Sequence, residues 1–285
     1  MKKIFFLLIA VKLFAFNWQV SHYTLNHYNS VKAGDKYVYG LITTGKLLKS
    51  TNKGMSWLHP INIDPNANSL YLTDVWFYKD SIGIICGQKD EKMIIYRSTN
   101  NGETWYQAYI YDPGNFYSEF NKIVFRYNIL WVAGDNGFLL KSTDFGKTWK
   151  KITLNSTDDI LSVDFYDENL GFLTTKNAQF LITTNSGNNW SSKTILNNVK
   201  QIYSIKVIDN NNIIAVGSFG KLIRSTDAGN SWDVITINSS VNFSDFAKIG
   251  EYYIIAGNNG NIFVSNDLNN WEKQTLPKDF KNANF

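Results

Sequence analysis

Five short segments of the chain place hydroxyl, carboxylate or amide, and glycine at a constant spacing before a tryptophan, and a sixth segment is a shortened copy. They read STNKGMSW (residues 50–57), STNNGETW (98–105), STDFGKTW (142–149), TTNSGNNW (183–190) and STDAGNSW (225–232), and a shorter copy, SNDLNNW (265–271), has Asn269 where the glycine is expected. Oxygen-bearing side chains in a short loop could bind calcium, and a carboxylate there could act as a general acid or base. The repeat is therefore the first candidate for a chemical site.

The third position of the segments argues against both kinds of chemistry. It is a carboxylate in Asp144, Asp227 and Asp267 but an amide in the other three copies. An amide cannot exchange a proton at neutral pH, and too few carboxylates recur to build a repeated cation site. We therefore predict a structural turn with no catalytic residue, no metal and no cofactor. In this turn Ser or Thr and Asp or Asn bond backbone N–H groups, glycine takes a positive φ, and tryptophan begins a strand.

The residues assigned to this structural turn are Ser50, Asn52, Gly54 and Trp57; Ser98, Asn100, Gly102 and Trp105; Ser142, Asp144, Gly146 and Trp149; Thr183, Asn185, Gly187 and Trp190; Ser225, Asp227, Gly229 and Trp232; and Ser265, Asp267 and Trp271.

The elements that position these turns repeat with them. The tryptophans are 48, 44, 41, 42 and 39 residues apart, a period typical of propeller blades. An apolar run precedes each turn, a glycine-rich or polar link such as GDNG (134–137), GSFG (217–220) or GNNG (257–260) joins it to another apolar run, and most units carry an alternating run further upstream. With the strand that leaves each tryptophan, this predicts an all-β, single six-bladed β-propeller of four-stranded antiparallel blades, with the turn in the hairpin between the third and fourth strands. A seventh blade is the alternative, and residues 18–25 are a further strand-like stretch that could help close the ring.

The repeated segments match the Asp-box, or BNR repeat, whose pattern is Ser/Thr-x-Asp-x-Gly-x-Thr/Ser-Trp. Together with the lead-in strand and the glycine link, residues 30–271 resemble the propeller family of the photosystem II assembly factors, Ycf48/Hcf136-like. The resemblance implies a non-enzymatic propeller that acts as a protein-binding or assembly scaffold. Asp-boxes also occur in sialidases and other glycan-active proteins, so a carbohydrate-binding or glycan-active secreted propeller is the alternative.

The sialidase alternative requires an arginine triad. The chain has only three arginines, and Arg97 and Arg224 precede a repeated turn at a position where sister units carry Lys49 or Lys141. We expect these two arginines to serve the repeat rather than a substrate carboxylate. Glycoside hydrolase activity is therefore not expected.

The N-terminus favours export. Met1–Lys3 is basic, residues 4–11 are apolar, and residues 13–15 offer a cleavage site, which predicts a signal peptide over 1–15 and a propeller domain over 16–285. Cleavage would leave 25 basic against 24 acidic residues, and no run of lysine or arginine favours nucleic acid. We expect an extracytoplasmic (periplasmic or secreted) monomer, without a membrane span after cleavage, whose partners are proteins of the cell envelope or a glycan.

The unequal loops on the end of the blades opposite the repeated turns are the predicted binding surface. The longest connections are residues 59–74 and 111–121, and 87–93 is the longest link between second and third strands. Aromatic residues in turn-rich segments often anchor partners. Phe116, Tyr117 and Phe219 are accordingly the candidate partner-binding residues.

Overall fold

The computed structural model describes residues 28–114, 117–192, 199–209 and 211–276. Within these ranges the chain forms six four-stranded antiparallel sheets, each built from four consecutive strands. This confirms the predicted six-bladed β-propeller class and removes the seven-blade alternative. The predicted signal peptide (1–15) and the extra stretch at 18–25 lie outside the described residues.

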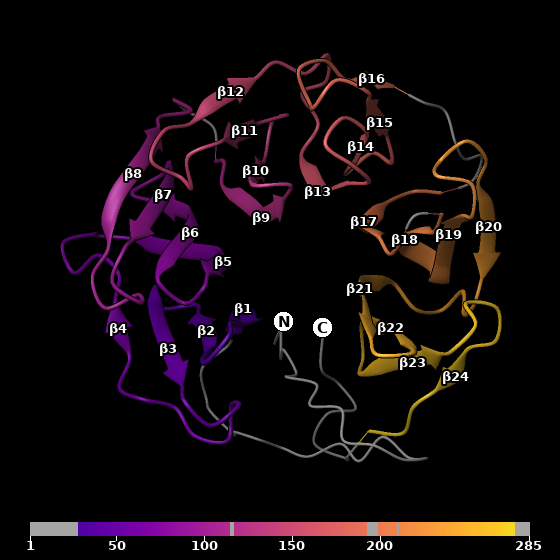
Figure 1. Cartoon of the computed structure of the whole chain (residues 1–285), viewed down its shortest axis with the longest axis horizontal. Coiled ribbons are helices and arrows are strands. Elements are labelled where there is room, and N and C mark those ends of the chain that lie inside the picture. The colour runs from indigo at the N-terminus through magenta and orange to yellow at the C-terminus, as the bar shows by residue number, and fades with distance from the viewer. Residues whose placement is uncertain (1–27, 115–116, 193–198, 210, 277–285) are drawn as a thin grey trace. The chain divides into compact units, whose positions relative to one another are not determined.

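The chain divides into two compact units, residues 3–151 and residues 152–285, which are described separately. The strands of the first unit form blades 1, 2 and 3 (Figure 1): β1 (Tyr28–Ala33), β2 (Val38–Ile42), β3 (Lys46–Ser50) and β4 (Ile61–Asn62); β5 (Leu70–Tyr78), β6 (Ile82–Lys89), β7 (Lys92–Ser98) and β8 (Tyr106–Tyr111); and β9 (Phe120–Arg126), β10 (Ile129–Gly134), β11 (Leu139–Ser142) and β12 (Lys150–Ile152).

The second unit contains blades 4, 5 and 6. Its strands are β13 (Ile160–Phe165), β14 (Gly171–Thr175), β15 (Phe180–Thr183) and β16 (Ser191–Ser192); β17 (Ile202–Val207), β18 (Ile213–Gly217), β19 (Lys221–Ser225) and β20 (Asp233–Thr236); and β21 (Phe243–Ile249), β22 (Tyr252–Gly257), β23 (Asn261–Ser265) and β24 (Glu272–Lys273). A short 3-10 turn, η1 (Ser218–Gly220), links β18 to β19. No helix within the described ranges has the length and apolar character of a membrane span.

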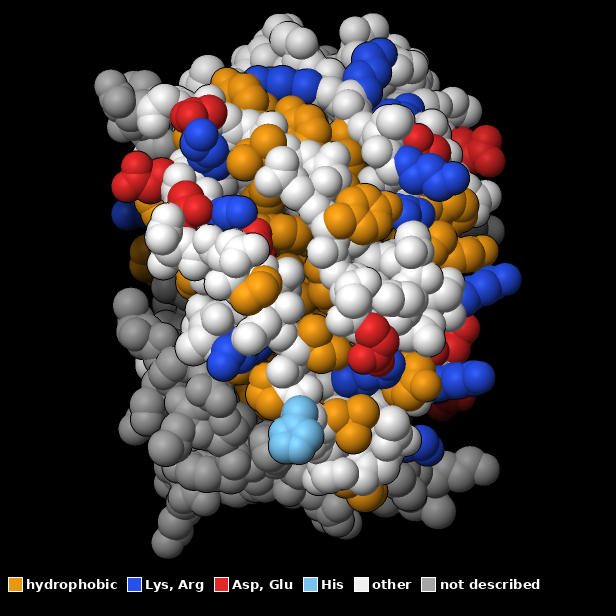
Figure 2. All heavy atoms as spheres, turned by 90° about the vertical axis from the view of Figure 1, so that its left-hand side faces the viewer, with side chains coloured by type: hydrophobic (Ala, Val, Ile, Leu, Met, Phe, Trp, Pro, Cys, Tyr) orange, Lys and Arg blue, Asp and Glu red, His pale blue; other side chains and the backbone are white. Residues whose placement is uncertain are grey.

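Burial follows strand order in each blade. Every residue of β2, β14 and β18 is buried, which explains why second strands read as unbroken apolar runs, since both faces of such a strand pack inside the protein. Outer strands are mostly exposed, as in β8 and β20. On the outer side of the first unit, hydrophobic side chains are interspersed with polar and charged ones of both signs (Figure 2).

The first strand of every blade carries a β-bulge against the second strand. The register shifts occur between Tyr28 and Ser30 in β1 and at the equivalent place in β5, β9, β13, β17 and β21. A bulge turns the following side chain toward a new direction. In β5 it places Asp74, which is buried, where it can reach the two neighbouring first strands.

Asp74 joins the three blades of the first unit. Its carboxylate accepts hydrogen bonds from the Ser30 hydroxyl (2.6 Å) in blade 1 and the Ile123 N–H (2.9 Å) in blade 3, and Lys32 Nζ lies 3.5 Å away. Burial raises the pKa of Asp74, but the charges of Lys32 and Lys122 and these hydrogen bonds lower it below its ordinary value. The ionised carboxylate is therefore a structural link between strands.

The second unit uses the same kind of link. Asp164 of β13 accepts a hydrogen bond from the Val207 N–H in β17 (2.9 Å), and the Ser204 hydroxyl of β17 donates to Asp245 in β21 (2.7 Å). Buried polar groups that have partners stabilise a particular arrangement, because an alternative packing would leave them unpaired. Serine and aspartate on the first strands therefore set how neighbouring blades align within each unit.

Candidate functional site

The repeated turns lie between the third and fourth strands of the blades, as predicted, and their polar groups are used internally. In the turn of blade 3, the Ser142 hydroxyl donates to Asp144 Oδ1 (2.8 Å) and accepts from the Gly146 N–H (2.9 Å). Asp144 Oδ1 also accepts from the Thr148 N–H at 3.0 Å. The first of these bonds recurs in all six turns, and the bond from glycine N–H to hydroxyl recurs in the five full-length copies.

The carboxyl groups of Asp144 and Asp227 are ionised at neutral pH and so cannot act there as general acids. Burial raises the pKa of Asp144, but hydrogen bonds from Thr148, Ser142 and Lys147 lower it to about 2. The hydrogen bonds from Ser231 are the main cause that lowers the pKa of Asp227 to about 2. A group with so low a pKa carries no proton to donate at neutral pH. The turns therefore have the geometry of folding elements.

In three of the turns, the glycine carbonyl also holds the tryptophan. Trp105, Trp190 and Trp232 donate their indole N–H to the carbonyl oxygens of Gly102, Gly187 and Gly229, respectively, at 2.9–3.2 Å. An indole N–H that folding removes from water usually finds such a partner. The Trp232 ring of blade 5 also packs edge-on against Phe180 of blade 4, with ring centroids 4.9 Å apart.

In the shortened sixth turn, the residue that takes the role of the glycine is not the one that the sequence indicated. Leu268, not Asn269, takes the glycine's role: its N–H donates to the Ser265 hydroxyl (2.9 Å), its carbonyl accepts from the Trp271 indole (3.3 Å), and its φ is 62°. The side chain of Leu268 is buried in the core of blades 5 and 6. Its burial offsets the unfavourable backbone conformation of a residue that has a Cβ.

In three blades, a basic residue directly before the turn reaches the turn of the next blade. Lys49 Nζ donates to the carbonyl of Asn101 (3.2 Å), and Arg97 Nε donates to the carbonyl of Phe145 (2.8 Å). In blade 5, Arg224 donates to Asn269 Oδ1 at 2.7 Å. These cations connect neighbouring blades, and so the arginines serve the repeat, as the sequence indicates.

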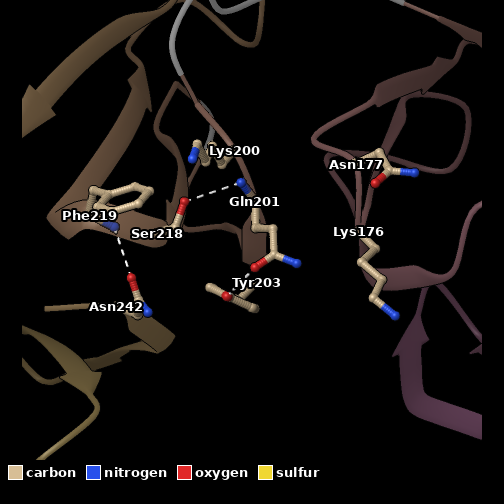
Figure 3. A pocket seen from close by; sticks show the side chains of 8 residues that line it. All are labelled: Lys176, Asn177, Lys200, Gln201, Tyr203, Ser218, Phe219 and Asn242. Atoms are coloured by element: carbon tan, nitrogen blue, oxygen red, sulfur yellow. Dashed lines mark hydrogen bonds between the residues drawn. The ribbon is translucent and has the colours of Figure 1, made fainter.

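A pocket of about 380 Å³ opens in the second unit at the end of the blades opposite the repeated turns. Three blades contribute to it (Figure 3), through the β14–β15 link, the segment that enters β17, the β18–β19 link and the segment that enters β21. Its lining residues are Lys176, Asn177, Lys200, Gln201, Tyr203, Ser218, Phe219 and Asn242. A pocket of this size suits a small ligand or a few residues of a peptide.

Phe219 is the exposed aromatic residue of this pocket. It is 46% exposed and adopts a left-handed backbone conformation with φ of 56°. Its N–H donates to Asn242 Oδ1 (3.0 Å), and Lys200 Nζ lies 5.4 Å from the centre of its ring. A phenylalanine with positive φ is uncommon, because its Cβ approaches the backbone.

Two sister turns show what this backbone position otherwise carries. The links GDNG and GNNG have Asn136 (φ 55°) and Asn259 (φ 54°) at the equivalent position. The N–H of the second residue of each link bonds the segment that enters the first strand of the same blade: Asp135 N–H to Glu119 O, Ser218 N–H to Gln201 O and Asn258 N–H to Asn242 O, each at 3.0 Å. Asparagine is the better residue for this conformation. Blade 5 has a phenylalanine instead, although folding alone would favour asparagine.

Of the other two candidate partner-binding residues, only Tyr117 is among the described residues, and it does not line this pocket. Phe116 lies outside the described residues. Tyr117 belongs to the first unit, is 66% exposed, and donates its hydroxyl to Glu119 Oε2 (3.2 Å). Burial and Glu119 raise the pKa of Tyr117 to about 12. The described parts of the long loops that the sequence singled out around blade 2 contribute no lining residue to the pocket, whose lining comes from blades 4, 5 and 6.

Of the residues that line the pocket, the sequence predicted only Phe219 as a candidate binding residue. Lys176 and Asn177 are distant in the chain from Lys200 and Gln201, and their segments are neither long nor rich in aromatic residues. Comparison of the three glycine-rich links was the available signal, because GSFG alone carries an aromatic residue. Only the packing of three blades shows that these segments meet.

The described residues hold no group of three or more His, Cys, Asp or Glu side chains that could bind a metal. The pocket is lined by amines, amides, hydroxyls and one phenyl ring, without a carboxylate. Cys86 is buried, and burial raises the pKa of its thiol. A thiol of this kind is a poor nucleophile.

Known proteins resemble this chain in sequence and in fold. The model of the Sortilin-Vps10 family, described as sortilin, neurotensin receptor 3, matches residues 93–285. The photosystem II stability/assembly factor HCF136, chloroplastic, of Oryza sativa subsp. japonica is 26% identical over 136 residues, which cover 46% of this chain and 31% of the rice protein. The matched region thus spans about a third of that relative.

The fold is also similar to solved structures. The structure of YCF48 bound to D1 peptide has a TM-score of 0.67 and 15% identity, covering 84% of this chain and 77% of YCF48. An ancestral GH74 enzyme has the same TM-score of 0.67 and 16% identity, covering 87% of this chain and 38% of the enzyme. At such identities the structural likeness shows the fold alone. Together with the rice relative and the family match, these findings confirm the resemblance to the Ycf48/Hcf136-like propellers.

Proposed function

The chain belongs to the Sortilin-Vps10 family of sortilin, neurotensin receptor 3, and from this premise we propose that it is a non-enzymatic, extracytoplasmic scaffold that binds a protein partner through the pocket around Phe219. The names of its relatives agree with such a role: one is an assembly factor, and another is a propeller with a bound peptide. The photosystem itself is not part of the proposal.

The observation that carries the proposal is Phe219. Its ring is 46% exposed and therefore adds only part of the stability that a core aromatic residue adds, while its backbone has an unfavourable conformation. Residues held in the left-handed conformation despite a Cβ cluster at active sites and ligand-binding sites. Aromatic residues that lie in a pocket with polar neighbours are also common anchors of protein interfaces.

The pocket does not support glycan hydrolysis. Glycosidases typically use two carboxyl groups on either side of the bond that breaks. Asp158 and Asp159 lie beside the pocket, but Asp158 accepts hydrogen bonds from Asn177 and Thr175, and Asp159 forms an ion pair with Lys176 at 3.0 Å. Carboxylates engaged in this way act as supports for the lining residues.

Export is the second part of the proposal. The basic start and apolar run of residues 1–15 support it. We place the partner in the cell envelope and propose that the mature protein is a monomer. Fractionation of the source cells, with mass spectrometry of the mature N-terminus, tests the location independently of binding.

Site-specific photocrosslinking tests the binding role. A photoreactive phenylalanine analogue at Phe219 should give a discrete crosslinked product with an envelope protein in source cells. The matched control carries the analogue at Tyr252, which is 42% exposed at the other end of blade 6. A product of equal yield from both positions, or none from either, would contradict the proposal. In pull-downs, the Phe219→Asn protein should no longer capture the partner that crosslinks to the analogue at position 219.

A further inference from the structure

The end of the first unit that carries the repeated turns has an excess of exposed positive charge. Because consecutive strands are antiparallel, the links between first and second strands lie at this end together with the turns. The exposed cations in or beside these segments are Lys36, Lys53, Lys79, Arg126 and Lys147. The turns of the three blades are neighbours, since Lys49 and Arg97 each reach the turn of the next blade.

The carboxylates at this end are mostly used within the protein. Asp80 is buried, and Asp144 accepts hydrogen bonds within its own turn. Glu103 forms an ion pair with Lys49 at 3.0 Å. Asp35 is exposed and offsets one of the positive charges. A positive surface therefore remains, and it extends over all three blades of the unit.

The opposite end of the same unit is acidic. Its links, and the strand residues that border them, carry Asp64, Asp90, Glu91, Asp112, Glu119 and Asp135 against Lys46, Lys89 and Lys92. A charge distribution of this kind steers the positive end of a protein toward a negative surface. The turn end of the first unit is thus electrostatically complementary to an anionic surface.

Exposed apolar side chains stand among these cations. Met55 lies in the repeated turn of blade 1, Leu58 follows that turn, and Tyr127 lies in the turn between β9 and β10. Tyr127 has a φ of 50°, a conformation that asparagine adopts more readily. Apolar side chains beside lysine and arginine are typical of surfaces that insert into the headgroup region of a membrane, and tyrosine suits this boundary because its ring is apolar and its hydroxyl polar.

From this arrangement we infer that the turn end of the first unit docks on an anionic lipid surface. Lys53, Lys79 and Lys147 lie at the phosphate groups, and Met55 and Tyr127 lie between the headgroups. An acidic protein would also attract the cations, but separate apolar side chains on turns of different blades suit a surface into which they insert. The inference is independent of the pocket, whose lining residues all belong to the second unit.

Flotation with lipid vesicles tests the inference with the mature chain. The protein should float with phosphatidylcholine vesicles that contain phosphatidylglycerol, and not with vesicles of phosphatidylcholine alone. High salt should release it, because salt screens the attraction between exposed charges. The neutral vesicles also separate this surface from any purely apolar segment, which would bind both kinds of vesicle.

Charge variants locate the surface. Each lysine near an anionic membrane strengthens binding about fivefold, so Lys79→Gln combined with Lys147→Gln should weaken binding about 20-fold. The matched control combines Lys92→Gln, at the opposite end of blade 2, with Lys273→Gln, on the exposed outer strand β24. The control loses the same charge and should bind as the wild type does.

Tyr127→Asn tests the apolar contribution without harm to the fold. Its Tm should equal or exceed that of the wild type, because asparagine suits the left-handed backbone. Its binding to the anionic vesicles should fall about fivefold, since an apolar ring no longer enters the headgroup region.

Three results would overturn the inference. They are equal flotation with neutral and anionic vesicles, an equal loss of binding in the two pairs of charge variants, and binding to neither kind of vesicle. In the last case, capture of an acidic protein by the wild type but not by the Lys79→Gln, Lys147→Gln protein would assign the surface to a protein partner instead. The proposed role of Phe219 would stand in all three cases.

Discussion

The backbone at Phe219 gives a prediction that depends only on local geometry. Replacement of Phe219 by Ala, Asn and Gly removes the aromatic ring in all three variants but changes the backbone preference in different ways. At a φ of 56°, alanine keeps the unfavourable contact of the Cβ, asparagine tolerates the conformation better, and glycine has no Cβ at all. The stability of the three variants should therefore increase in the order Ala, Asn, Gly.

The magnitudes follow from exposure and backbone conformation. Full burial of a phenylalanine contributes about 1.5–3 kcal/mol, and Phe219 is 46% exposed, so loss of the ring costs about 1 kcal/mol. The left-handed conformation costs a residue with a Cβ about 1–2 kcal/mol. Phe219→Ala should lose about 1 kcal/mol, whereas Phe219→Asn should lie within about 0.5 kcal/mol of wild type and Phe219→Gly at or above it.

Thermal unfolding followed by tryptophan fluorescence measures these differences. For a domain of this size, 1 kcal/mol corresponds to a shift in Tm of about 2–4 °C. Asn259, with a φ of 54° in the sister turn of blade 6, provides the control, because Asn259→Ala should be less stable than Asn259→Gly. Equal Tm values for the Ala, Asn and Gly variants at position 219 would refute the reasoning that Phe219 is present against the preference of the fold.

The other predictions concern the supports of the blades. Asp74→Asn should destabilise the protein by about 2–4 kcal/mol, because buried N–H and O–H donors lose a charged acceptor. Folding lowers the pKa of Asp74, so the stability that its carboxylate contributes is present above the ordinary Asp pKa of about 3.9 and is lost as the pH falls through the lowered pKa. The free energy of unfolding of Asp74→Asn should therefore depend less on acid pH than that of the wild type. Urea titrations at several pH values measure this difference. Ser142→Ala should cost about 1–2 kcal/mol in the same assay, since the Gly146 N–H loses its acceptor. Asp144→Asn should be nearly neutral at pH 7, because three sister turns carry Asn; a loss as large as that of Ser142→Ala would show that the charge is required. Arg97→Met should cost about 1–3 kcal/mol by leaving the carbonyl of Phe145 unpaired, and an unchanged Tm would contradict the role of Arg97 between blades.

The repeated turn was the most predictable part of the protein. Its side chains bond groups within four residues of themselves, as Ser142 bonds Asp144 and Gly146, and such local bonds leave a regular pattern in the sequence. The sixth turn shows the limit of this reasoning. Alignment placed Asn269 at the glycine position, whereas Leu268 occupies it, because burial of the leucine side chain in the core compensates for its backbone conformation.

The sequence by itself determined the class of fold, the number of blades and the place of the turns within them, since each follows from contacts between residues close in the chain. It also singled out Phe219 as an aromatic residue in a glycine-rich link. Tertiary structure alone decided that Phe219 shares a pocket with Lys176, Lys200 and Asn242, and that Asp74 joins three strands. These residues lie tens of positions apart in the chain. The packing of neighbouring blades brings them together, and no pattern of nearby residues in the sequence indicates that packing.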